Sequence, residues 1–148
     1  MDIRIEIAAR IFAIEYGVIS LKELVEWADH QIQIEEHPHS NFIDVSLAKT
    51  LGEALSALNK FEATEDISAV AQLAFRFFYQ SLCSGSGNYQ LIAHGLYSMA
   101  MDGFIPKPKI EGAMWSFWDS LDLAIAGVVG DPEEVKSEIL AFLKENKG

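Results

Sequence analysis

Apolar residues recur every three or four positions along most of this chain, which is the spacing that places them on one face of an α-helix. No pair of neighbouring segments combines strand-like alternation with the turn residues of a β-hairpin. The sequence therefore predicts an all-α fold, an antiparallel or orthogonal bundle of about seven to eight helices joined mostly by short polar links. The predicted helices cover about residues 3–16, 21–34, 42–48, 51–61, 65–83, 89–102, 111–129 and 132–143.

Local signals mark several helix starts. Ser20 and Glu23 form a capping-box pair, in which each side chain bonds a backbone amide at the start of the second helix. Asn41 and Thr64 are expected to cap the third and fifth helices, because their side-chain oxygens accept hydrogen bonds from free backbone N–H groups. Pro132 fits the first position of the last helix, where an amide proton has no partner within the helix.

The predicted helix over residues 111–129 carries apolar residues around its circumference rather than along one stripe. Trp115 and Trp118 belong to this girdle. Aromatic residues at helical spacing are usually part of a core, and that is the expectation here. The alternative is that both tryptophans lie in an interface with a partner, or with a second copy in a homodimer.

Length and composition indicate one domain. The chain has 148 residues, half of them apolar, so residues 1–148 can bury a continuous core without disulfides or metals. Cys83 is the single cysteine, and we expect it to pack as a small hydrophobic residue. No secretory signal pattern opens the sequence and no apolar run has the length of a membrane span, so we expect a cytoplasmic protein.

The charge is strongly negative and unevenly distributed. The formal net charge is -11, which opposes binding to nucleic acid or to an anionic membrane. Residues 1–74 hold 13 acids and 5 bases, whereas residues 75–148 hold 9 acids and 6 bases. The first half therefore carries the stronger negative field, which serves solubility and can also attract a basic partner.

The acidic residues gather around a polar segment at 35–41, which contains Pro38 and has no apolar anchor. We expect this segment to be an exposed loop. The acids within it and on the flanking helices are the candidate partner-binding residues, namely Glu23, Glu26, Asp29, Glu35, Glu36 and Asp44.

The same region suggests a metal site or acid–base chemistry as alternatives. His30 and His37 lie among these acids, and imidazole and carboxylate groups bind zinc or iron. However, Glu26 and His30 are four positions apart, whereas helical di-iron sites use duplicated Glu–His pairs three apart. Asp119 and Asp122 share one helix face, but acid–base catalysis would require burial to raise one pKa. We expect no catalytic residue, no cofactor and no bound metal.

Two segments resemble small bacterial helical proteins. The run Leu24-Val25-Glu26-Trp27-Ala28-Asp29, the acidic proline-containing link and the run Phe42-Ile43-Asp44-Val45-Ser46-Leu47-Ala48 are similar to a pattern in such proteins. Some of those proteins are assigned as immunity partners of secreted toxins. The resemblance covers about the first 60 residues. It implies a small helical protein that neutralises a basic enzyme by covering it, and it implies no catalytic motif.

Three functions follow from these observations. The first is a non-enzymatic protein-binding module, including an immunity-type inhibitor of a basic protein. The second is a self-associating structural protein that buries Trp115 and Trp118. The third is a metal-dependent or acid–base enzyme built on His30, His37 and Asp44, or on Asp119 and Asp122. The first is the hypothesis that the sequence favours.

Overall fold

The computed structural model describes residues 2–148, which form an all-α protein, as the hydrophobic pattern predicts. No helix in this part of the chain is both long enough and apolar enough to cross a membrane. The helices are α1 Ile3–Glu15, α2 Leu21–Ile34, α3 Ser40–Ser46, α4 Leu51–Leu58, α5 Ile67–Ser84, α6 Tyr89–Met101, α7 Glu111–Ile125 and α8 Pro132–Asn146, with a 3-10 turn, η1, at Pro108–Ile110.

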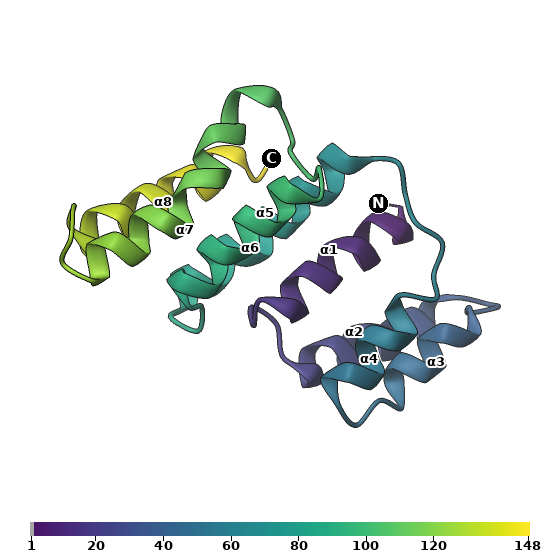
Figure 1. Ribbon diagram of the computed structural model, residues 1–148. Coiled ribbons are helices and arrows are strands. Elements are labelled where there is room, and N and C mark those ends of the chain that lie inside the picture. Colours follow the sequence, from purple (N-terminus) through teal and green to yellow (C-terminus); the bar gives the residue numbers. More distant parts are fainter. Residues whose placement is uncertain (1) are drawn as a thin grey trace.

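The first helix separates two hydrophobic cores. Helices α2, α3 and α4 lie on one side of α1, whereas α5 to α8 lie on the other (Figure 1). Ile7 and Ile14 of α1 belong to the N-terminal core with residues of α2 to α4. Ile5 and Phe12 belong to the C-terminal core with residues of α5 to α8. A helix placed between two cores must be apolar on two faces, which explains why Ile3, Ile5 and Ile7 alternate with charged residues at the start of the chain, a pattern that by itself would also fit a strand.

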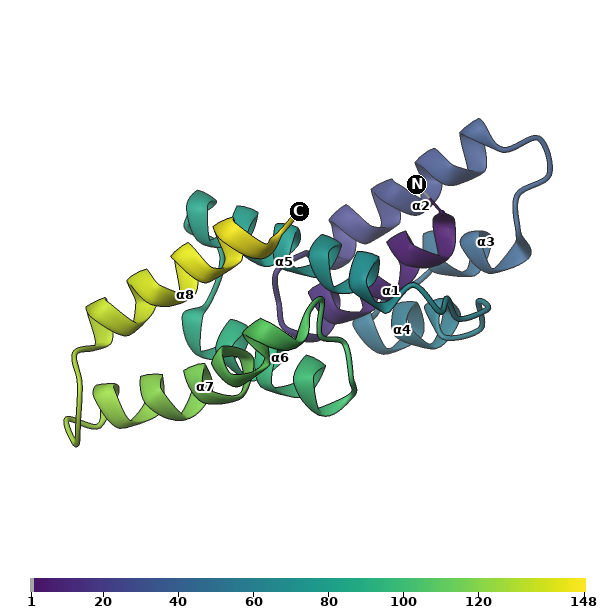
Figure 2. The same ribbon diagram turned by 90° about the horizontal axis from the view of Figure 1, so that it is seen from above.

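The two cores are built differently. The N-terminal core is small and is closed by Leu24 of α2, Val45 of α3 and Leu58 of α4. The C-terminal core is larger and is centred on α5, whose Phe75 and Phe78 are completely buried. Helices α7 and α8 extend together from α5 and α6 toward the end of the molecule opposite α3 (Figure 2).

Two predicted helix caps are wrong, each by two residues. His39, and not Asn41, caps α3, because its Nδ1 accepts a hydrogen bond of 3.1 Å from the backbone N–H of Asn41. Asp66, and not Thr64, caps α5 through a bond from the N–H of Ala69. Helix α3 begins at Ser40, so Asn41 already lies inside it and donates its own N–H to the cap, whereas α5 begins only at Ile67, directly after Asp66.

Helix α7 is shorter than predicted. It ends at Ile125, and its buried residues are Met114, Phe117, Leu121 and Ala124, which form one stripe at helical spacing. Trp115 and Leu123 lie outside this stripe, so apolar residues also occupy other faces of α7, but the expectation that the helix reaches residue 129 is wrong. Val128 lies beyond the helix and is exposed.

Gly95 of α6 packs closely against Tyr16, which follows α1, and against Phe78 of α5. A Cβ atom at this position of α6 would lie 3.0 Å from the ring of Tyr16 and 3.3 Å from Phe78. A side chain at this position would therefore have to displace the Tyr16 ring slightly.

Candidate functional site

The α2–α3 loop lies at one end of the molecule (Figure 2). Two of the six candidate acids beside it are already used within the protein. The Glu23 carboxylate accepts from the N–H of Ser20 at 3.4 Å and completes the predicted capping box. Asp29 is half-buried and accepts a hydrogen bond from the Ser46 hydroxyl, which joins α2 to α3. These two residues hold the local fold.

The other four acids form what we call the acidic surface: Glu26 on α2, Glu35 and Glu36 in the loop, and Asp44 on α3. All four are exposed. The ion pairs within residues 2–148 are Asp2–Arg4, Glu6–Arg10 and Glu133–Lys136, so none of them includes an acid of this surface. Its carboxylates therefore direct their negative charge at solvent.

The histidines near this surface do not gather into a metal site. Among residues 2–148, no group of three or more His, Cys, Asp or Glu side chains is arranged to hold an ion. His30 and His37 are exposed on α2 and in the loop. His39 uses Nδ1 to cap α3 and packs its ring on Phe61, with the ring centres 4.8 Å apart.

A pocket of about 370 Å³ opens beside the loop, between it and the start of α1. Its aromatic wall is made by Phe42 and Phe61, whose ring centres are 4.7 Å apart. Three carboxylates and one guanidinium line it, so its formal charge is -2 when its two histidines are neutral. The charged and imidazole side chains of this pocket are Asp2, Arg4, Glu35, His37, His39 and Glu62.

The one cation of this pocket is already neutralised. Arg4 donates from Nη2 to Oδ2 of Asp2 at 2.9 Å and from Nε to Oδ1 at 3.3 Å. These hydrogen bonds lower the pKa of Asp2 and raise the pKa of Arg4, and the nearby charge of Glu62 adds to the second effect. Glu35 and Glu62 are therefore left as the pocket's uncompensated negative charges.

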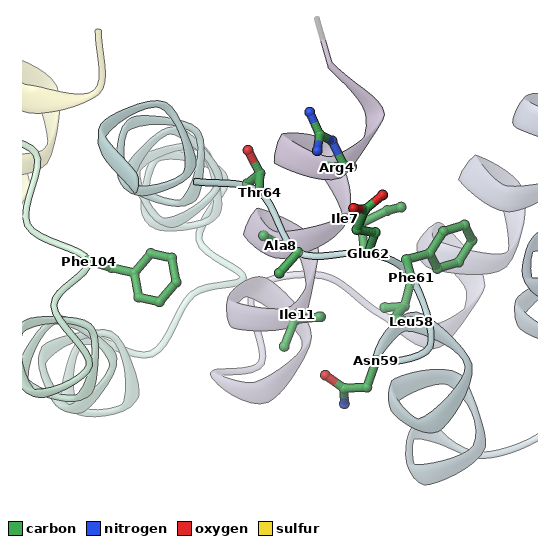
Figure 3. Close-up of a pocket in the computed structure, with 11 residues that line it drawn as sticks. Arg4, Ile7, Ala8, Ile11, Leu58, Asn59, Phe61, Glu62, Thr64 and Phe104 are labelled. Atoms are coloured by element: carbon green, nitrogen blue, oxygen red, sulfur yellow. The ribbon is translucent and has the colours of Figure 1, made fainter. Parts of the chain in front are cut away.

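A second, mostly apolar recess adjoins this pocket. It has a volume of about 170 Å³ and shares Arg4, Phe61 and Glu62 with the larger pocket. Figure 3 shows the chain from Phe61 to Thr64 crossing over α1, with Phe104 facing α1 from the other side. Ala8 and Ile11 form the α1 face between them.

No protein-family model matches the sequence, and no significant match was found among curated proteins or solved structures.

The second candidate surface, around Trp115 and Trp118, is a packed aromatic cluster. Both tryptophans are half-buried against the C-terminal core. Trp118 stacks on His94 of α6, with ring centres 4.2 Å apart and planes inclined by 21°. Trp115 contacts Tyr97 edge-on at 5.1 Å and donates its Nε1 hydrogen bond to Glu111. The cluster joins α6 to α7, so each tryptophan has a structural role within the protein.

Two other residues singled out by their chemistry also have a defined place. Cys83 is exposed, so the expectation that it packs as a small hydrophobic residue is wrong. Its helical position near the end of α5 turns it outward, away from the buried Leu82. Asp119 and Asp122 are both exposed on α7, and so lack the burial that the acid–base interpretation requires.

The sequence does not predict the pocket between the α2–α3 loop and the start of α1, nor several of the residues that line it. The hydrophobic pattern predicts Phe61 at the end of the fourth helix, but α4 ends at Leu58 and Phe61 lies in the following loop. Glu62 and Arg4 belong to no sequence motif that would indicate a binding site. Only the packing of α4 against α1 brings residues 59–64 over the start of the chain, so no local signal could have found this pocket.

Proposed function

We propose that this chain is a non-enzymatic protein-binding module that recognises a basic protein through the acidic surface. The observation that carries the proposal is the absence of Glu26, Glu35, Glu36 and Asp44 from every ion pair within residues 2–148, although all four are exposed. Exposed carboxylates without an ion-pair partner attract a complementary basic patch, and charge complementarity increases association rate and specificity.

An immunity-type role is the form of this function that the sequence resemblance supports. Such a protein would act in the cytoplasm by covering the active site of a basic enzyme. Its binding rate would depend on ionic strength, because the range of exposed charges falls to about 8 Å at physiological salt. We therefore expect association to slow markedly between about 0.05 M and 0.5 M salt, with a smaller change in dissociation.

Charge reversal on the acidic surface tests the proposal. The test variant combines Glu26→Lys, Glu35→Lys, Glu36→Lys and Asp44→Lys. It leaves Glu23 and Asp29 unchanged, since these two residues hold the helix cap and the α2–α3 contact. Each variant is immobilised and used to capture proteins from a lysate of the source cells, and the captured proteins are identified by mass spectrometry.

A control variant makes the same change of net charge elsewhere. It reverses four exposed acids of α7 and α8 that belong to no ion pair within residues 2–148, namely Asp119, Asp122, Glu138 and Glu145. We expect one basic protein to be captured by the native chain and by the control, and to be lost with the test variant. The proposal fails if no protein is captured, or if both variants lose it equally.

A further inference from the structure

We infer that the pocket between the start of α1 and the α2–α3 loop takes an arginine side chain. This inference rests on the proposed function, since the arginine would belong to the basic partner. The pocket has a volume of about 370 Å³, which is within the range of ligand sites and large enough for a guanidinium group on its alkyl stem.

The aromatic wall favours a planar cation. Phe61 is half-buried and His39 is exposed, with their ring centres 4.8 Å apart, so these two rings are accessible in the wall, whereas Phe42 is only 3% exposed. A guanidinium group stacks on such rings through cation–π and planar contacts, whereas an ammonium group is compact and strongly hydrated. The apolar side chain of Ile3, which also lines the pocket, is suited to contact the alkyl stem.

The carboxylates supply the matching charge. Glu35 and Glu62 line the pocket, are exposed and belong to no ion pair within residues 2–148. Arg4 does not oppose an entering cation strongly, because Asp2 binds it at two atoms. A carboxylate that accepts from a guanidinium forms one of the stronger types of hydrogen bond in proteins.

The adjoining recess points to a polypeptide rather than a free amino acid. It continues from the pocket across Phe61 and Glu62 and is lined by Ile7, Ala8 and Ile11 of α1. An arginine in the pocket would thus place the neighbouring residue of its own chain near an apolar surface. A free amino acid would instead bring a carboxylate into this negatively charged region.

Titration with two small probes tests the inference. Acetyl-arginine amide and acetyl-lysine amide have the same charge and no free termini. Binding of each to the ¹⁵N-labelled full chain is followed by the backbone amide shifts. We expect arginine to shift amides of residues 35–42 and 59–64 saturably, and to bind about five- to tenfold more tightly than lysine.

Two neighbouring glutamates provide a matched pair of variants. Glu35 lines the pocket, whereas Glu36 is exposed in the same loop and does not line it. Glu35→Gln should weaken arginine binding about five- to tenfold, and Glu36→Gln by less than about twofold. Phe61→Leu keeps an apolar wall but removes the ring, so it should weaken binding of arginine more than that of lysine.

Three results would overturn the inference: equal binding of the two probes, equal effects of the two glutamate substitutions, or shifts centred outside the pocket. Any of these leaves the proposed function intact if charge reversal still abolishes capture of the partner. Conversely, arginine binding in the pocket with no captured partner would contradict the proposed function and not the pocket. The two failures are therefore distinguishable.

Discussion

The guanidinium carbon of Arg10 lies 4.3 Å from the centre of the Trp27 ring, and 5.1 Å from that of Phe77. Trp27 packs against the N-terminal core and Phe77 against the C-terminal core, so this arginine contacts one ring from each. Within residues 2–148 its ion-pair partner is Glu6, whose Oε1 lies 3.7 Å from Nη1 of Arg10. Burial lowers the pKa of Arg10 to about 10, with the charge of Glu6 opposing the effect. The side chain is therefore charged at neutral pH in a costly environment.

We expect Arg10→Met to change the free energy of unfolding by less than about 1 kcal/mol, because an apolar chain of similar length keeps the packing and removes a buried charge. Arg10→Ala should cost about 2 kcal/mol, since it leaves a gap between the two rings. Urea unfolding at pH 7 measures both. Equal losses for the two variants would show that the charge, and not the packing, joins the cores.

The exposed carboxylate of Glu15 gives a pH-dependent prediction. Desolvation raises its pKa, and the nearby charge of Asp102 adds to the shift. Because its pKa is raised, Glu15 binds a proton more tightly in the folded protein than in the unfolded chain. Protonated Glu15 is therefore better tolerated by the fold than ionised Glu15, and the protein loses stability as the pH rises through the folded-state pKa. Glu15 is also the last residue of α1, and the partial negative charge of the helix dipole at this C-terminal end disfavours the ionised carboxylate.

Glu15→Gln should therefore stabilise the protein at pH 7 by about 0.5 kcal/mol or less, because much of the effect is screened by solvent. The gain should shrink as the pH falls through the raised folded-state pKa of Glu15 and should be absent below the ordinary value of 4.5, where the Glu15 carboxyl is protonated in both the folded and the unfolded chain. Thermal unfolding between pH 4 and pH 7 gives this dependence, with Glu138→Gln on α8 as the control. A gain that does not vary with pH would contradict the assignment.

Two glycines within helices should respond in opposite ways to the same substitution. Gly95→Ala should destabilise the protein by about 1–3 kcal/mol, because its Cβ would meet the Tyr16 ring at 3.0 Å. Gly112 of α7 is exposed, and a Cβ there meets nothing within 4 Å. Gly112→Ala should stabilise by about 0.5–1 kcal/mol through helix propensity. Chemical denaturation of both variants provides the comparison, and a stabilised Gly95→Ala protein would disprove the close approach.

The two histidines of the α2–α3 loop should also differ. His39→Ala removes the cap of α3 and a contact with Phe61, so it should cost about 1 kcal/mol or slightly more. His39→Asn should recover most of the loss, since asparagine is a good N-cap. His37→Ala should change stability by less than about 0.5 kcal/mol because His37 is exposed. Denaturant midpoints at pH 7.5 separate these cases; similar losses at both positions would refute the role of His39.

The sequence by itself determined the helices and the location of the charge. The capping box of Ser20 and Glu23 and the first position of Pro132 lie where the local pattern predicts them. The exposed acids of the α2–α3 loop were equally visible, because a segment without apolar residues cannot be buried. These features depend on residues within a few positions of each other, so the amino-acid sequence is sufficient to predict them.

Only the tertiary structure decided how α1 serves two cores and where the pocket lies. The alternating isoleucines of α1 are compatible with a strand or with a helix that is apolar on two faces. Packing of other helices on both sides of α1 decides for the helix. Arg10 contacts Trp27 of α2 and Phe77 of α5, and Glu35 and Glu62 line one pocket, because the tertiary fold brings these segments together. Such contacts depend on the direction in which each helix leaves its turn, and the hydrophobic period alone does not specify that direction.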